Sequence, residues 1–112
     1  MRSRYSVIAL AALAALAACG DDVDPSCDST VTYQTVGEPY LANWCLGCHS
    51  VDVPPGMRQQ APVGMNFDTV DEVRAQLISL ESVTLQQTMP PEGGPADAER
   101  TLWLQWLSCG AP

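Results

Sequence analysis

The stretch Cys45-Leu46-Gly47-Cys48-His49 reads C-x-x-C-H, which is the attachment pattern of c-type haem. The two thiols of this pattern can add to the two vinyl groups of a haem, and the imidazole that follows them can bind the iron from one face. The stretch thus combines covalent capture with one axial ligand. We expect Cys45, Cys48 and His49 to hold one covalent haem c, with His49 as an iron ligand.

Other interpretations of the cysteine pair stay open at this point. With Trp44 the string reads W-C-x-x-C, similar to the redox dithiol of thioredoxin, so Cys45 and Cys48 could serve a thiol–disulfide oxidoreductase. That dithiol lies in a βαβ context, however, and this short chain shows no such alternation. A structural zinc site needs four ligands, whereas the stretch gives three and the chain has no second histidine.

The N-terminus has the organisation of a targeting segment. Two arginines, Arg2 and Arg4, precede an unbroken run of Val, Ile, Leu and Ala over 7–18, which is short for a membrane span but fits a signal-peptide core. The run leads directly into Cys19 and resembles a bacterial lipobox there. We expect a signal peptide over 1–18 and lipidation of Cys19, which would anchor the exported protein on the periplasmic side of a bacterial membrane. An ordinary signal peptide is the alternative.

The mature chain would then contain a tether and one small domain. Residues 19–29 are acidic and poor in apolar side chains, as is typical of a flexible tether, and residues 30–112 form the domain. Because export places Cys27 and Cys109 in an oxidising compartment, we expect them to form a disulfide, which stabilises a loop of this length by about 4 kcal/mol. Two free thiols are the alternative, since the sequence does not give the distance between their Cα atoms.

The pattern of apolar residues predicts an all-α domain. Residues 30–36 are rich in Thr, Val and Tyr and are predicted to be extended, leading into a helix that begins near Gly37 or Glu38. Residues 51–64 are predicted to form a loop because they contain three prolines. The first helix is expected to bury one face, made of Tyr40, Leu41, Trp44 and Cys48.

Two further helices are predicted downstream. The string Thr69-Val70-Asp71-Glu72 fits a capping box, and a helix is expected over 69–81. The last helix is expected to begin at Pro95 and to stop at Gly110. Its apolar stripe is expected to consist of Leu102, Trp103, Trp106 and Leu107.

The candidates for the second axial ligand are methionines, because His49 is the only histidine. Haem iron in cytochromes c is bound by Met and His. We favour Met89, which lies between two predicted helices and is followed by two prolines that stiffen the backbone. Met65 is the second choice and Met57 the third candidate, and an open sixth position is the remaining possibility.

These features resemble a class I c-type cytochrome domain, and more narrowly the small bacterial lipoproteins that carry one haem c. The resemblance covers roughly residue 33 to the C-terminus. It implies a small all-α fold in which the N- and C-terminal helices cross beside a covalent haem, with Tyr40, Leu41 and Trp44 packed on Trp103, Trp106 and Leu107. The stretch between His49 and Met89 is shorter than in many class I cytochromes, so we expect a more exposed haem edge on that side. The matching stretches are Cys45–His49, Ala61–Gly64, Asp68–Thr69, Met89–Pro91 and Trp106–Pro112.

The expected function is that of a membrane-anchored one-electron carrier, which is not an enzyme. The chain from residue 19 onward has three arginines and no lysine against thirteen acidic residues, which argues against nucleic-acid partners and fits either a basic redox partner or plain solubility. Arg58 is expected to be a solvated surface side chain, with a haem propionate as the alternative partner. A thiol–disulfide oxidoreductase, and a haem sensor or peroxidase with an open sixth position, are the rival functions.

Overall fold

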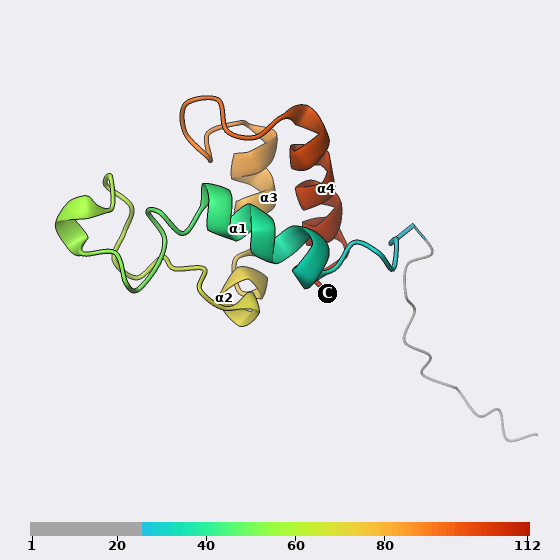
Figure 1. Cartoon of the computed structure of the whole chain (residues 1–112), viewed down its shortest axis with the longest axis horizontal. Helices are drawn as coiled ribbons and strands as arrows, with labels where there is room; N and C mark the ends of the chain where they lie inside the picture. Colours follow the sequence, from blue (N-terminus) through green and yellow to red (C-terminus); the bar gives the residue numbers. More distant parts are fainter. Residues whose placement is uncertain (1–25) are drawn as a thin grey trace, which may run out of the picture.

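The computed structural model describes residues 26–112 (Figure 1), so the predicted signal peptide, Cys19 and most of the tether lie outside the described residues. Every regular element within this range is a helix, which confirms the all-α class for this part of the chain. No helix in the same range is both long and apolar enough to cross a membrane. The elements are η1 (Tyr33–Gly37), α1 (Glu38–Trp44), η2 (Pro55–Met57), α2 (Val70–Arg74), α3 (Leu77–Leu85) and α4 (Asp97–Ser108).

The first helical segment begins earlier than the sequence indicated. A π-helical turn, η1, leads directly into α1, so the prediction of an extended segment over 30–36 is wrong from Tyr33 onward. The cause is a reciprocal cap: Thr32 Oγ1 accepts a hydrogen bond from the Thr35 N–H at 3.2 Å, and Thr35 Oγ1 accepts one from the Thr32 N–H at 2.9 Å. The α-helix itself begins at Glu38, as predicted.

The middle of the chain contains two short helices where one was predicted. The capping box is confirmed, because Thr69 Oγ1 accepts from the Glu72 N–H at 3.3 Å and Glu72 Oε2 accepts from the Thr69 N–H at 2.8 Å. The single helix over 69–81 is wrong: α2 stops after Arg74, and α3 starts after Gln76. The Gln76 N–H bonds to the carbonyl of Val73, three residues back, which tightens the last turn and redirects the chain.

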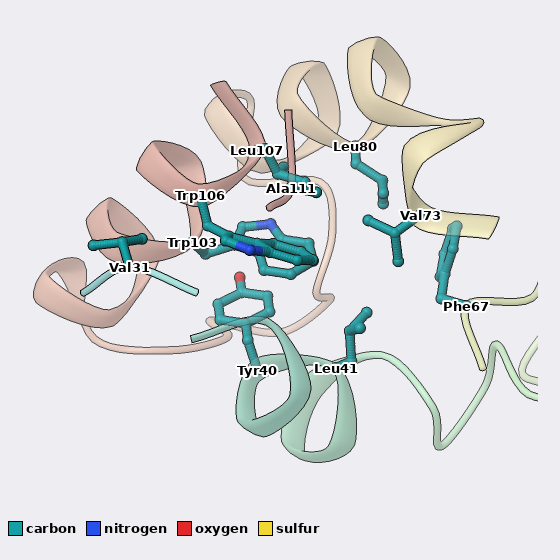
Figure 2. Packing of buried hydrophobic residues seen from close by; sticks show 10 residues of the cluster. All are labelled: Val31, Tyr40, Leu41, Phe67, Val73, Leu80, Trp103, Trp106, Leu107 and Ala111. Carbon is teal, nitrogen blue, oxygen red and sulfur yellow. The ribbon is translucent and has the colours of Figure 1, made fainter. Parts of the chain in front are cut away.

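The C-terminal helix lies at the centre of the core. It begins at Asp97, shortly after the predicted start, and ends before Gly110, whose φ of +85° favours glycine. Trp103 and Trp106 are completely buried, and the ring of Tyr40 stacks on Trp103 with 4.2 Å between the ring centroids. Figure 2 shows Tyr40 and Leu41 extending from α1 toward these two indoles. Contacts between α3 and α4, and between η1 and α4, complete the packing.

The predicted apolar faces of the first and last helices are wrong in part. Trp44 is 37% exposed and Leu102 is 45% exposed, so neither belongs to the buried core. The Trp44 indole N–H donates a hydrogen bond to Glu99 Oε1 at 2.8 Å, and this bond explains why the ring lies at the edge of the helix pair. Cys48 lies beyond the end of α1, is half-buried and does not belong to the core either. The remaining members of both faces pack as expected.

The two ends of the described chain lie together. Cys27 and Cys109 form a disulfide, with 5.8 Å between their Cα atoms. Beside it the Tyr33 N–H and the Trp106 indole N–H both donate to the carbonyl oxygen of Pro112, at 3.0 and 2.9 Å. The start of the first helical segment is therefore fixed to the end of the last one.

Candidate functional site

A cavity of about 480 Å³ lies beside the C-x-x-C-H stretch, within the size range of cofactor and ligand sites. Its wall comes from the end of α1, the loop that projects to the left in Figure 1, one face of α3, and the segment between α3 and α4. The predicted haem contacts Cys45, Cys48, His49 and Met89 all line it, as does the second-choice ligand Met65.

The C-x-x-C-H stretch follows α1 as a tight turn. The Cys45 N–H continues the helical pattern by donating to the Leu41 carbonyl at 2.9 Å. The Cys48 and His49 N–H groups then both donate to the Cys45 carbonyl, at 3.1 and 2.9 Å. The α-helix thus ends at Trp44, but the turn keeps both thiols and the imidazole on the cavity wall.

The hydrogen bonding of His49 fixes which ring nitrogen is free. Nδ1 lies 2.9 Å from the backbone carbonyl oxygen of Met65. Because a carbonyl oxygen can only accept, Nδ1 carries the proton and Nε2 keeps its lone pair. The imidazole is almost completely buried, and Phe67 packs against it with 5.1 Å between ring centroids. An oriented imidazole with a free Nε2 is the form that binds a metal.

The Cys45 thiol does not have the electrostatics of a redox-active cysteine. Neither Cys45 nor Cys48 is in a disulfide, and burial raises the pKa of the Cys45 thiol to about 12. A catalytic dithiol requires the opposite, a lowered pKa that yields a thiolate near neutral pH. The all-helical surroundings also lack the strands of a thioredoxin-type site within residues 26–112.

Arg58 is a buried residue, so the prediction of a solvated side chain is wrong. Only 2% of it is exposed, and the residue lines the cavity. No carboxylate of the described chain forms an ion pair with it. Instead Nη1 donates to the Ser50 carbonyl, Nε to that of Ala61, and Nη2 is shared among three acceptors. These acceptors are the carbonyl oxygens of Pro62 and Met65 and the side-chain oxygen of Asn66, at 2.9, 3.1 and 2.7 Å.

The three methionines occupy different environments. Met89 is 44% exposed and lies in the segment after α3, where its N–H donates to the Val83 carbonyl at 3.3 Å. Met65 also lines the cavity, but its carbonyl binds Nδ1 of His49, which places its backbone behind the imidazole, away from Nε2. Met57 is 70% exposed and is not part of the cavity wall.

Sequence reasoning missed the contribution of α3 to the cavity. Gln76, Ser79, Leu80 and Val83 line it, at the spacing of one helix face. This periodicity was visible in the sequence, but nothing local distinguishes a face that lines a cofactor site from one that packs on another helix.

Comparisons with models of known protein families, with curated proteins and with solved structures give no match for this chain. Within residues 26–112 no three His, Cys, Asp or Glu side chains gather into a metal site of their own.

Proposed function

We propose that this protein is a one-electron carrier that holds a single covalent haem c, with His49 and Met89 as its axial ligands. One observation carries the proposal: a single cavity is lined by the two thiols of the C-x-x-C-H stretch, by its histidine and by Met89, although Met89 is distant in sequence. A cytochrome c requires these four groups to meet.

The residues of the cavity fit the group. Cys45 and Cys48 would form its two thioether links, and the Nε2 lone pair of His49 is free for the iron because Nδ1 is hydrogen-bonded. The thioether of Met89 would supply the second neutral ligand. Leu80, Val83 and other apolar side chains of the wall suit a porphyrin, and the buried cation of Arg58 suits a propionate.

When bound, the haem iron would supply the electron-transfer chemistry by alternating between its ferrous and ferric states. The side chains of this protein contribute binding and environment. Two neutral ligands and a wall of low polarity favour the less charged, reduced state and hence a high reduction potential. The buried His49 and its packing on Phe67 keep water away from one side of the site.

The two rival functions receive less support. A thiol–disulfide oxidoreductase is disfavoured because burial raises the pKa of the Cys45 thiol instead of lowering it. A haem sensor or peroxidase would need a sixth position open to a ligand, whereas Met89 lines the same cavity as His49. If an added ligand can displace Met89 from the iron, the reduced protein will bind carbon monoxide in the test below.

The partners and the location follow from the sequence. The lipobox-like end of the apolar run supports lipidation of Cys19, export and a membrane anchor on the periplasmic side. The strong excess of acidic residues supports a basic redox partner and disfavours nucleic acids.

The test is to express the full chain in a host that attaches haem to exported proteins. The mature protein should gain the mass of one haem that survives denaturation. The Met89→Ala variant should keep this mass but lose the absorption band of a thioether–iron bond in the oxidised protein. Met57→Ala, at an exposed methionine outside the cavity, is the matched control and should keep the band.

Three results would contradict parts of this proposal. Wild-type protein without added haem mass would overturn the haem assignment. Loss of the band in Met65→Ala, with retention in Met89→Ala, would mean that Met65 and not Met89 binds the iron. Rapid binding of carbon monoxide by the reduced wild-type protein would favour the sensor or peroxidase.

A further inference from the structure

We propose that Arg58 is a positioning residue for His49 that acts through the backbone carbonyl of Met65 and raises the reduction potential of the bound haem. The inference rests on the proposed function, because the potential is that of the haem. Arg58 would change the potential through the hydrogen bond between His49 Nδ1 and the Met65 carbonyl.

The geometry is a chain of two hydrogen bonds that meet at one atom. The Met65 carbonyl oxygen accepts from His49 Nδ1 at 2.9 Å and from Arg58 Nη2 at 3.1 Å. A carbonyl oxygen has two lone pairs, so both bonds can exist together. One donor is a neutral imidazole, and the other belongs to a permanently charged guanidinium.

The charge of Arg58 weakens the carbonyl as an acceptor for His49. A bond from a cation draws electron density from the carbonyl oxygen, so less negative charge is available to the imidazole N–H. The imidazole then donates less density to the iron through Nε2, which disfavours the ferric state. Hydrogen bonds around a ligand are an established means by which proteins tune a metal.

The rest of the Arg58 environment holds the Met65 carbonyl in position. The guanidinium bonds the carbonyls of Ser50 and Pro62, at 2.6 and 2.9 Å, and so joins the two ends of the loop. No carboxylate within the described chain pairs with it. Asp68 is held by its own hydrogen bonds to Ser50 and Val51, which lower its pKa with some help from the charge of Arg58, and it forms no ion pair with Arg58.

The arrangement predicts that two substitutions shift the reduction potential in opposite directions. Nη2 has two hydrogens for three acceptors, and the shortest of these bonds goes to Asn66 Oδ1 at 2.7 Å. Arg58→Met removes the cation and should lower the potential. Asn66→Ala removes the competing acceptor, which strengthens the bond to Met65, and should raise the potential.

The experiment measures the reduction potential of the haem-loaded proteins together with the exchange rate of the His49 Nδ1 proton by NMR. Arg58→Lys keeps a charge but cannot bridge the same carbonyls. We expect a lowered potential and slower exchange of the His49 Nδ1 proton in both Arg58→Met and Arg58→Lys, because the Met65 carbonyl becomes a stronger acceptor, and a raised potential in Asn66→Ala. Arg74→Met is the control, because this half-exposed arginine pairs with Asp71 outside the cavity wall.

The outcomes separate the two proposals. Wild-type protein without haem would overturn the proposed function and this inference with it. If the potential is lowered in haem-loaded Arg58→Met but unchanged in haem-loaded Arg58→Lys, the positive charge alone sets the potential. This result would overturn the proposal that Arg58 acts through the Met65 carbonyl. If neither Arg58 variant folds, a potential in Asn66→Ala that is unchanged or lower overturns the inference.

Discussion

Replacement of Gly37 by alanine is expected to destabilise the domain because the first helical segment and α4 approach most closely there. A Cβ atom built at Gly37 would lie 2.7 Å from Cζ2 and 2.8 Å from Cη2 of Trp106. Carbon atoms in contact prefer separations of about 3.5–4.0 Å. The two segments would therefore have to move apart by roughly 0.8 Å or more.

The surroundings of Trp106 leave no room for this movement. Its ring is fully buried, packs on Tyr33 and Trp103, and donates its indole N–H to the Pro112 carbonyl at 2.9 Å. Overpacking a dense core costs about 1–3 kcal/mol. Because Gly37 has a helical φ of −61°, alanine is not strained there and regains about 0.4–1 kcal/mol from the unfolded chain. The difference between the two is a net loss of about 1 kcal/mol.

The assay is thermal and urea unfolding of the purified protein followed by circular dichroism. A loss of about 1 kcal/mol corresponds to a midpoint lowered by roughly 4–8 °C in a domain of this size. Gly56→Ala is the matched control, because its added Cβ would contact nothing within 4 Å, and it should unfold near the wild-type temperature. If Gly37→Ala unfolds at the same temperature as this control, the close approach to Trp106 is wrong.

Three further substitutions test other features. Replacing Cys27 and Cys109 together by serine opens a cross-link between residues 82 apart in sequence and should lower the unfolding free energy by about 4 kcal/mol; an unchanged urea midpoint would contradict this. Tyr40→Phe removes a buried hydroxyl that has no hydrogen-bond partner within the described chain, so it should raise the free energy of unfolding by about 1 kcal/mol. A lower thermal midpoint than that of the wild type would mean that the hydroxyl is hydrogen-bonded and would contradict the prediction. The hydrogen bond from Ser50 lowers the pKa of Asp68, so the contribution of its carboxylate to the free energy of unfolding is lost as the pH falls below 3.8. Asp68→Asn should therefore show a weaker dependence of this free energy on pH below 3.8, and an acid-unfolding transition like that of the wild type would contradict the prediction.

Local signals allowed some of the helix ends to be predicted. The capping box of Thr69 and Glu72 joins residues three apart, so the sequence contains both partners. The same kind of cap at Thr32 went unrecognised because its second partner is Thr35, where the usual pattern has Glu or Gln. Gly110 stopped α4 as expected, since a positive φ at a helix end is a local requirement.

Features that depend on the path of the loop could not be predicted. Whether an arginine is solvated or buried depends on the carbonyls around it, and those that bind Arg58 come from residues 50 to 66. No periodic pattern brings these groups together, because the segment has no regular structure apart from η2. The bond between His49 and the Met65 carbonyl depends on the same loop path and was invisible for the same reason.

The wall of the cavity is built from two parts that are held by different forces. On one side, α1, α3 and α4 pack through tryptophans and aliphatic side chains, and burial of apolar surface stabilises them. On the other side, the loop over 50–66 adds no residue to the apolar core, and its main internal link is the buried cation of Arg58. His49 lies where the two parts meet, with its backbone following α1 and its Nδ1 bonded to the loop. A change in the loop can therefore reach His49, the proposed iron ligand, without disturbing the helical core, and this separation suits Arg58 to the tuning role proposed for it.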